Sequence, residues 1–280
     1  MRCEWQTYLN LLPVWLRKEV DKYGRDTLLE VRLRKDMFPQ LITRSGVLWI
    51  ERSIYKEDIS YCINAASQYS PWSIKSVNSG YITAPGGHRI GICGTSVTTD
   101  RCELGFQTIM SLCIRVARDF PGVSKDAETL SRSVLIIGKP GSGKTTFLRD
   151  LVRTRSETES IAVVDEKAEI FPISHEKYCF SIGKQNDILT GVPKGSGIEM
   201  VLKNMTPQTI AVDEITSQED CEALIHAGWC GVDLFATAHA RDLQDLKRRS
   251  VYRPLVQSGL FETVVVMHPD KTWHTERIIS

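Results

Sequence analysis

One eight-residue stretch constrains the fold of this chain more than any other part of its sequence. Residues 138–145 read Gly-Lys-Pro-Gly-Ser-Gly-Lys-Thr and fit the P-loop pattern G-x-x-x-x-G-K-[ST]. The pattern binds phosphate when a strand precedes it and a helix follows it. The apolar run 134–137 predicts the strand, and residues 145–153 place their apolar side chains on one helical stripe. We therefore expect an α/β domain with a phosphate-binding loop.

Each residue type in this loop has a chemical reason. Glycines let successive backbone N–H groups approach phosphate oxygens, and the following helix N-terminus adds partial positive charge. The Lys144 ammonium would reach the β- and γ-phosphates, and the Thr145 hydroxyl would hold Mg²⁺. The sequence thus predicts ATP and Mg²⁺ as ligands. The predicted nucleotide contacts are Gly138, Lys139, Pro140, Gly141, Ser142, Gly143, Lys144, Thr145 and Thr146.

A Walker B pattern follows later in the chain. Residues 209–214 form a β-rich run that ends in Asp213 and Glu214. Asp213 would contribute to the Mg²⁺ shell from the side opposite Thr145. Glu214 would orient or deprotonate the attacking water as a general base. An apolar run before two carboxylates is a weak signal alone, but together with the P-loop it indicates a nucleotide site.

A second run, residues 161–166, also ends in two carboxylates, Asp165 and Glu166. Ligands of parallel sheets bind beyond the carboxyl ends of the strands, so both side chains would face the phosphates if their strand neighbours the P-loop strand. Asp165 is then a further candidate metal ligand. Glu166 competes with Glu214 for activation of the water, and its alternative role is an ion pair with a nearby Lys or Arg.

Further polar candidates are a histidine and two arginines. Residues 234–239 end in Thr237-Ala238-His239, and His239 would sense the γ-phosphate or, alternatively, cap the following helix. Arg89 and Arg115 lie in the first part of the chain. If subunits form a ring, an arginine of one subunit can approach its neighbour's γ-phosphate, an effect on the order of 10³–10⁵ in rate. Surface arginines are commoner than such catalytic ones.

Length and the order of predicted elements indicate two domains, residues 1–125 and 126–280. The first is a mixed α+β region, with a helix at 4–20 bent near Pro13, a helix at 56–69 and a hairpin that turns at 84–87. The second alternates strands and helices, which is typical of a mostly parallel sheet. Its predicted strands are 134–137, 161–165, 178–182, 209–213, 233–237 and 263–267, and its predicted helices lie near 145–154, 197–205, 219–229 and 242–257.

Composition excludes several classes of protein. The net charge of +1 argues against general electrostatic binding of nucleic acid, so we expect no nucleic-acid partner. No two of the eight cysteines have C-x-x-C spacing, which favours reduced thiols in a cytoplasmic protein over a zinc cluster. No apolar run reaches 18 residues, so we expect no transmembrane helix and only peripheral membrane contact through partners.

A series of motifs resembles a known family. The motifs are residues 29–34 (Leu-Glu-Val-Arg-Leu-Arg), 86–91 (Gly-Gly-His-Arg-Ile-Gly), 114–118, the P-loop, 163–170, 212–215 and 237–239. In this order they resemble the stage III sporulation protein AA family of endospore-forming bacteria, from about residue 28 to residue 267. Walker motifs are shared by very many ATPases, whereas Asp-Glu-Lys-Ala-Glu-Ile at 165–170 and the arginine-rich N-terminal strands are more specific.

This family is similar to the traffic ATPases of type II and type IV secretion and of pilus machines. The resemblance implies a smaller N-terminal α+β domain on a RecA-like P-loop ATPase domain, assembled as a hexameric ring. It also implies a cytoplasmic motor for a channel between mother cell and forespore, held there by membrane proteins. By position, residues 165–166 resemble the aspartate box and residues 237–239 the histidine box. Arg89 and Arg115 resemble the arginines that reach the neighbouring site.

Four interpretations of the function differ in what they predict. The first is a ring-forming, Mg²⁺-dependent ATP hydrolase whose activity depends on oligomerisation. The second is a RecA-like nucleic-acid motor, which the neutral net charge weighs against. The third is a small-molecule kinase, for which no acceptor-pocket motif is seen. The fourth is a nucleotide-gated scaffold that binds ATP and hydrolyses little of it.

Overall fold

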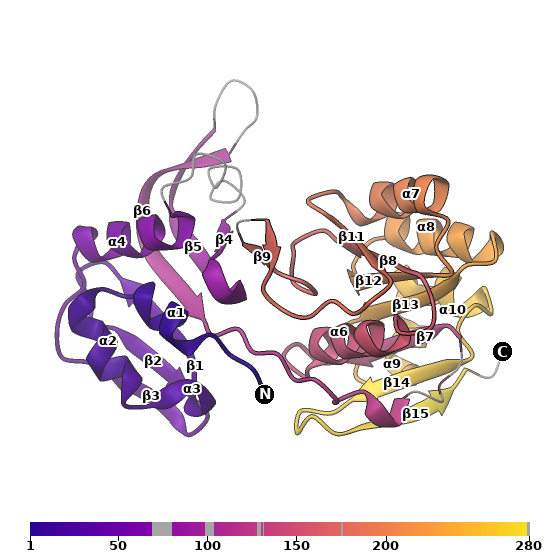
Figure 1. Cartoon of the computed structure of the whole chain (residues 1–280), viewed down its shortest axis with the longest axis horizontal. Coiled ribbons are helices and arrows are strands. Elements are labelled where there is room, and N and C mark those ends of the chain that lie inside the picture. Colours follow the sequence, from indigo (N-terminus) through magenta and orange to yellow (C-terminus); the bar gives the residue numbers. More distant parts are fainter. Residues whose placement is uncertain (69–79, 99–103, 128–129, 131, 175, 279–280) are drawn as a thin grey trace. The chain divides into compact units, whose positions relative to one another are not determined.

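The computed structural model describes residues 1–68, 80–98, 104–127, 130, 132–174 and 176–278 (Figure 1). The chain divides into two compact units. Unit 1 comprises Met1–Asp119 and Pro172–Cys179, and unit 2 comprises Phe120–Phe171 and Phe180–Ser280. The domain boundary expected after residue 125 stays a prediction, because these units divide the chain after Asp119 and place a short later segment with unit 1. Among the described residues, no helix is long and apolar enough to cross a membrane.

Unit 1 is built on an antiparallel sheet with the strand order β3-β2-β1-β6-β5-β4. Its strands are β1 (Leu28–Arg34), β2 (Gln40–Thr43), β3 (Gly46–Trp49), β4 (Tyr81–Thr83), β5 (Arg89–Thr98) and β6 (Leu104–Arg115). Its helices are α1 (Trp5–Asn10), α2 (Val14–Asp21), α3 (Gly24–Thr27), α4 (Lys56–Ser67) and the 3₁₀ turn η2 (Pro85–Gly87). The later segment adds the short pair β9 (Ile173–Ser174) and β10 (Lys177–Tyr178).

Strand alternation decides which face of this sheet is covered. In β1, Val31 and Leu33 are buried on one face, and Glu30 and Arg32 lie on the other, where they form an ion pair at 2.6 Å. The helices α1, α2 and α4 pack on the buried face, so this unit has one apolar core. That core includes Tyr8, Leu12, Leu16, Ile59, Cys62, Ile90, Leu112 and Ile114.

A neutral histidine is buried beside this core. His88 Nδ1 accepts a hydrogen bond from the Ala117 backbone N–H at 3.0 Å, so the proton sits on Nε2, which donates to the Glu4 carbonyl at 3.1 Å. Burial lowers the pKa of His88 from 6.5 to about 4. Protonating Nδ1 would place two N–H groups against each other. The folded state therefore holds this imidazole in its neutral form.

We expect the stability of unit 1 to fall as pH drops from about 6.5 to about 4. In this range the unfolded chain binds a proton at His88, whereas the folded chain keeps the imidazole neutral. The full loss from this group is about 3 kcal/mol. Urea unfolding of wild type and of His88→Gln, followed by tryptophan fluorescence at several pH values, measures it. The variant should be less stable at pH 7 but should have the shallower pH dependence. Parallel pH profiles would contradict the prediction.

Unit 2 is built on a mostly parallel sheet with the strand order β11-β8-β12-β13-β7-β14-β15, and only the last pair is antiparallel (Figure 1). The strands are β7 (Val134–Gly138), β8 (Ile161–Asp165), β11 (Asn186–Thr190), β12 (Thr209–Ile215), β13 (Asp233–Ala238), β14 (Thr263–Met267) and β15 (Trp273–Arg277). The helices are η3 (Lys125–Ala127), α6 (Lys144–Arg155), α7 (Lys194–Met205), α8 (Gln218–Trp229), α9 (Leu243–Arg248), η4 (Ser250–Tyr252) and α10 (Arg253–Gln257).

Both faces of this sheet are covered by helices, which explains its continuous apolar strands. In β7, Val134 and Ile136 point toward α6 and pack with Phe147 and Leu148. The alternate residues of β7 join the core on the opposite face. That core includes Leu135, Ile137, Ile198, Val201, Leu224, Leu243 and Leu255. The unit is thus a three-layer α/β/α arrangement.

Most predicted elements are present, and one strand prediction is wrong. No strand spans 178–182; the strand beside β8 is β11 (Asn186–Thr190). The sequence of β11, Asn-Asp-Ile-Leu-Thr, is half polar and gives a weak strand signal, and its side chains are partly buried or exposed. Ile182, which gave 178–182 its apolar signal, packs on the core from a loop. The predicted helix 4–20 is interrupted at Pro13, as expected, and the helix 56–69 is seen as α4, with residue 69 outside the described residues.

Candidate nucleotide site

The predicted site residues follow strands that end at the same edge of the unit 2 sheet. The P-loop follows β7, Asp213 and Glu214 lie at the end of β12, and His239 follows β13. One condition that the sequence analysis set is not met: β12 and β13 lie between β8 and β7, so the strand of Asp165 does not neighbour the P-loop strand. The Walker B strand and the strand of His239 occupy those positions instead. Asp165 and Glu166 therefore approach from the far side of β12.

The loop has the backbone that phosphate binding needs. Gly141 and Gly143 have φ values of 75° and 102°, in the left-handed region that favours glycine. Gly143 caps α6, so the first turn of that helix, with Lys144, Thr145 and Thr146, points its free N–H groups toward the loop. Lys139 and Pro140 are exposed at the tip of the loop.

Lys144 is buried inside this loop, with 6% of its surface exposed. Its Nζ donates hydrogen bonds to the carbonyl oxygens of Gly138 at 3.0 Å and Lys139 at 3.2 Å, and lies 3.0 Å from Nδ1 of His239. Burial lowers the pKa of the ammonium, and the carboxylates of Asp213 and Glu214 act in the opposite direction. A phosphate oxygen would supply the anionic partner that the loop carbonyls replace here.

Asp213, at the end of β12, joins the first turn of α6 to the end of β13 through two short hydrogen bonds. Its Oδ2 accepts from the Thr145 hydroxyl at 2.7 Å, and its Oδ1 accepts from the Thr237 hydroxyl at 2.5 Å. Thr237 is fully buried and its hydroxyl oxygen in turn accepts from the Glu214 backbone N–H at 2.7 Å. The P-loop, the Walker B strand and β13 are thereby fixed to one another at this carboxylate.

Glu214 sits on a bulge at the end of β12. Its φ is 55°, an uncommon value for a residue with a side chain, and the register with β13 shifts between Val212 and Ile215. The bulge turns the carboxylate toward His239, and Glu214 Oε1 lies 2.8 Å from His239 Nε2. Lys144, His239 and Glu214 thus form a continuous series of contacts. Such backbone strain is commonly stored at functional sites.

Asp165 and Glu166 are engaged differently. Asp165 accepts backbone N–H bonds from Glu169, Ile170 and Phe171 at 2.8–2.9 Å, and burial raises the pKa of its carboxyl to about 6 despite these bonds. Glu166 Oε2 lies 2.8 Å from Nζ of the buried Lys194. The carboxylates at 165, 166, 213 and 214 line one small cavity of about 20 Å³. Of the two roles suggested for Glu166, activation of the water or an ion pair, the structure shows the ion pair, with Lys194.

Arg89 and Arg115 lie opposite each other on neighbouring strands of unit 1. The Arg89 guanidinium stacks on the Tyr81 ring at 4.3 Å, and Arg115 Nε lies 3.5 Å from Glu30 Oε2. They are on the face of the sheet that carries charged side chains. Both residues belong to unit 1, whereas the P-loop belongs to unit 2.

The residues present fit a bound nucleotide and Mg²⁺. The Ser142 hydroxyl oxygen is buried in the loop and has no hydrogen-bond partner among the described residues, although buried polar groups are normally paired. Thr145 Oγ1 and Asp213 Oδ2 lie 2.7 Å apart in a hydrogen bond, so two oxygens, the ligand type that Mg²⁺ prefers, are already side by side. Asp165, by contrast, already accepts hydrogen bonds from backbone N–H groups with both of its oxygens.

Sequence analysis missed two residues that the structure brings to this site. Lys194 contacts Glu166, and Lys271 of the β14–β15 turn contacts the Gly141 carbonyl of the P-loop. Thr237, which the sequence analysis named beside His239, contacts Asp213. No local pattern marks Lys194 or Lys271, since each reaches the site from a loop or helix start that is distant in sequence.

Comparison with known proteins decides the family. Residues 5–279 match the family described as Sporulation stage III, protein AA. The chain belongs to this family. Stage III sporulation protein AA of Bacillus subtilis (strain 168) is 31% identical over 245 residues, which cover 83% of this chain and 80% of that protein. The family that the sequence motifs suggested is thus confirmed.

Solved structures confirm the predicted fold class. The pilus retraction motor PilT with bound ADP matches with a TM-score of 0.59 at 14% identity, over 89% of this chain and 76% of that one. The ATPase DotB of Yersinia pseudotuberculosis matches with a TM-score of 0.58 at 16% identity, over 94% of this chain and 77% of that one. The family member therefore has an α/β fold with a RecA-like P-loop unit, the fold that it shares with the ATPase DotB and the pilus retraction motor PilT.

Proposed function

We propose that this member of the stage III sporulation protein AA family is a Mg²⁺-dependent ATP hydrolase. The observation that carries the proposal is the 2.7 Å hydrogen bond from Thr145 Oγ1 to Asp213 Oδ2, beside the buried Lys144. It joins the P-loop to the Walker B strand across 68 residues of sequence. Those are the two parts that a P-loop ATPase needs for nucleotide and metal.

Lys144 and the N–H groups of residues 141–146 bind the β- and γ-phosphates in this proposal. Glu214 accepts the proton of the attacking water, because it is the carboxylate connected to Lys144 through His239. When the Lys144 ammonium turns to a phosphate, His239 loses one of its two contacts, and the imidazole can reorient Glu214. Glu166 has a supporting role, since its carboxylate is held by Lys194.

Mg²⁺, when bound, would neutralise negative charge on the phosphate oxygens. Thr145 and Asp213 are the residues proposed to hold it. Asp165, which the sequence also suggested, is better suited to shape the loop that carries Glu166, because it accepts three backbone N–H bonds.

Two measurements on the purified chain test this function. Calorimetric titration with Mg-ATP should give saturable heat, and phosphate release should exceed that of a sample without protein. No heat would contradict nucleotide binding. Heat without phosphate release would favour the nucleotide-gated scaffold. In that case the contact between Glu214 and His239 would keep the Glu214 carboxylate on the imidazole and away from the attacking water.

We further propose that the protein works as a homo-oligomeric ring, probed through Arg89 and Arg115. Specific activity should rise with protein concentration, and replacing either arginine with Ala should lower it by about tenfold, since the arginine on the opposite strand remains. Arg44→Ala, an exposed arginine of unit 1, is the control. Activity that is independent of concentration and of both arginines would contradict a shared site. Sedimentation velocity with Mg-ATP gives the subunit number, for which we propose six.

The biological role we propose is a cytoplasmic motor for a sporulation channel between mother cell and forespore, held at the membrane by partner proteins. Family membership and a fold shared with a pilus retraction motor support it. A RecA-like nucleic-acid motor would instead show ATPase activity that DNA or RNA stimulates and that salt weakens steeply. Phosphate release measured with and without DNA separates these two roles.

A further inference from the structure

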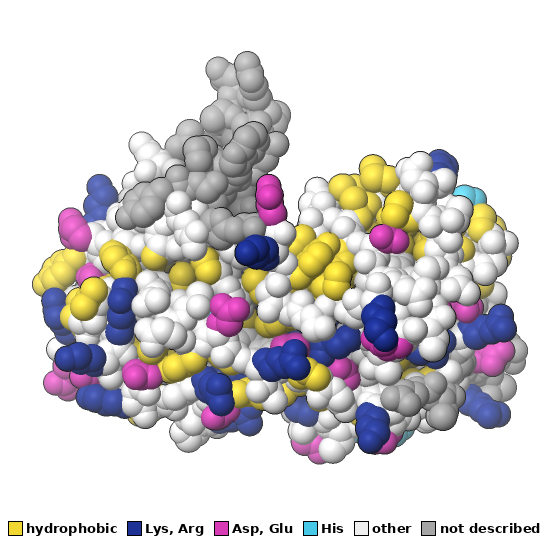
Figure 2. Space-filling view, viewed as in Figure 1, with side chains coloured by type: hydrophobic (Ala, Val, Ile, Leu, Met, Phe, Trp, Pro, Cys, Tyr) yellow, Lys and Arg dark blue, Asp and Glu magenta, His cyan; other side chains and the backbone are white. Residues whose placement is uncertain are grey.

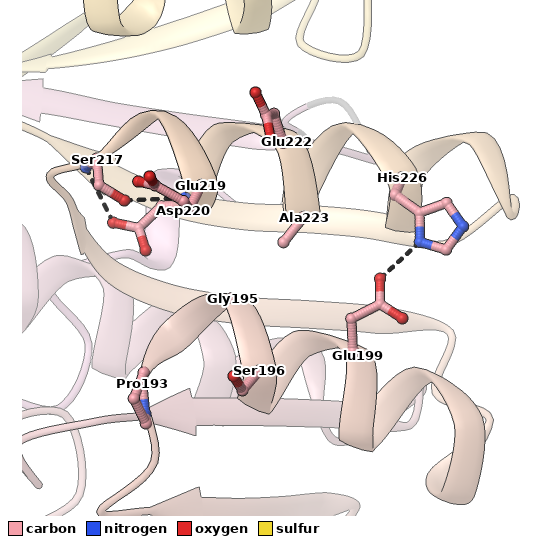
Figure 3. A pocket seen from close by; sticks show the side chains of 10 residues that line it. All are labelled: Pro193, Gly195, Ser196, Glu199, Ser217, Glu219, Asp220, Glu222, Ala223 and His226. Carbon is pink, nitrogen blue, oxygen red and sulfur yellow. Dashed lines mark hydrogen bonds and ion pairs between the residues drawn. The ribbon is translucent and has the colours of Figure 1, made fainter.

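A groove of about 570 Å³ runs between α7 and α8, outside the nucleotide site (Figure 3). Small residues lie between the two helices, among them Gly195, Ser196 and Ala223, so the groove is open to a side chain from outside. Figure 3 shows Glu199 of α7 and His226 of α8 meeting across it, with Glu199 Oε1 and His226 Nδ1 2.7 Å apart.

The charge of the groove is negative. Its lining includes Glu199, Glu219, Asp220 and Glu222, and no lysine or arginine. In the part of the chain that the structure describes, no basic side chain forms an ion pair with Glu219 or Glu222. Acidic residues at a helix N-terminus are expected, which accounts for Glu219 and Asp220. That rule does not account for Glu222, which lies further along α8, whereas Glu199 is paired with Lys203 at 3.3 Å.

Large apolar side chains are exposed on the same two helices. Met200 and Met205 of α7 are each 45% exposed, and Trp229 of α8 is 75% exposed. Trp229 follows His226 by three residues, so it extends the same helical stripe beyond the groove. Figure 2 shows hydrophobic side chains at the surface over α7. Exposed aromatic and Met side chains beside carboxylates suit a partner that is both basic and apolar.

A buried ion pair links this groove to the candidate catalytic carboxylates. Lys194 is the first residue of α7, where a cation is disfavoured by the helix dipole, and only 8% of it is exposed. Its Nζ lies 2.8 Å from Glu166 Oε2 and 3.9 Å from Oδ2 of Asp220. Asp220 lines the groove and Glu166 lines the cavity beside Glu214. A cation that enters the groove would compete with Lys194 for Asp220.

We propose that this groove docks a basic, amphipathic segment of a partner polypeptide, and that Lys194 couples its occupancy to Glu166. Lysine or arginine side chains of the segment pair with Glu219 and Glu222, and its apolar residues cover Trp229 and Met200. Lys194 is a positioning residue: it fixes Glu166 when the groove is empty, and it shifts toward Glu166 when Asp220 is shared. The docking does not depend on ATP hydrolysis, whereas the coupling rests on the proposed function.

Docking is tested with fluorescence anisotropy of the full-length chain. The probe is a fluorescein-labelled amphipathic peptide of Arg, Lys and Leu, and its counterpart replaces each basic residue with Glu. We expect binding of the basic peptide alone, weakened about tenfold in Glu219→Gln/Glu222→Gln and in Trp229→Ala. The matched control Glu157→Gln/Glu262→Gln removes two exposed carboxylates of unit 2 elsewhere and should bind like wild type.

Equal loss in the control pair, or no binding of the basic peptide to wild type, would overturn the docking site. Binding that disappears when the chain oligomerises with Mg-ATP would assign the groove to a second copy of this chain. That result would also overturn the proposal of a partner segment. Light scattering of the same samples records the oligomeric state.

Coupling is tested by phosphate release with and without the basic peptide. Wild type should change its rate several-fold on peptide addition, and Lys194→Met should bind the peptide yet lose that response, with Lys194→Arg restoring part of it. A peptide response that persists in Lys194→Met would overturn the coupling. If anisotropy shows docking but no sample releases phosphate, the docking site stands and the proposed hydrolase function fails.

Discussion

Replacing Glu214 with Gln is expected to lower the rate of ATP hydrolysis by about 10²–10⁴-fold, the range for loss of a general base. The amide keeps the shape of the side chain and can still contact His239, so ATP affinity should change by less than about threefold. Glu214 is our choice for the base because it connects to Lys144 through His239, whereas Glu166 is held by Lys194. Single-turnover phosphate release and calorimetry on the same sample separate the rate from the affinity.

Glu166→Gln is the matched comparison for this prediction. The two substitutions are chemically identical, and both carboxylates line the same small cavity. We expect a loss of about tenfold for Glu166→Gln, since the change weakens the ion pair with Lys194 and leaves the Lys144–His239–Glu214 contacts intact. A larger loss in Glu166→Gln than in Glu214→Gln would transfer the role of base to Glu166.

Lys144→Met should abolish measurable hydrolysis and weaken ATP binding by about 100-fold. The estimate follows from the loss of charge-assisted hydrogen bonds, worth roughly 1.5–3 kcal/mol each. Methionine fills the space of the buried lysine stem, so packing against the loop is largely kept. Calorimetry with Mg-ATP, together with thermal unfolding of the nucleotide-free chain, distinguishes lost binding from lost folding.

Lys139→Met is the control within the same loop. Lys139 is exposed at the loop tip, while Lys144 is buried, although both are lysines five residues apart. We expect Lys139→Met to retain binding and hydrolysis within about threefold of wild type. Equal losses in the two variants would show that the loop tolerates no change of charge, and would remove the special role assigned to Lys144.

The local parts of the candidate site could be predicted from the sequence because each is a short, continuous pattern. The glycine spacing of the P-loop requires one backbone shape, and apolar runs that end in carboxylates indicate strands whose ends face a ligand. The family motifs added the RecA-like type of the second domain, and they agreed with Arg89 and Arg115, which the residues had already suggested. The structure does bring together Lys144, Thr145, Asp213 and Glu214, the four residues to which these patterns assigned roles in the site.

What could not be predicted depends on strand order and on contacts distant in sequence. Nothing in residues 161–166 indicates that two later strands separate β8 from β7. Lys194 gave no signal either, because a lysine after a proline in a loop is usually solvated, and its burial depends on Glu166 and Asp220 together. The strand prediction at 178–182 failed for a related reason: apolar side chains can enter a core from a loop, while an edge strand such as β11 can be half-polar.

The order of strands in the unit 2 sheet has a consequence for synthesis of the chain. Both neighbours of β7 are made much later in the chain: β7 begins at Val134, whereas β13 begins at Asp233 and β14 at Thr263. While the ribosome is still adding those residues, the P-loop strand has emerged without a pairing partner, and Lys144, Thr145 and the N–H groups have no second half of a site. Non-local pairing of this kind folds slowly. A nascent chain that stops before β13 therefore cannot assemble a nucleotide site, and such fragments would depend on chaperones to keep the bare edges of β7 from pairing with other chains.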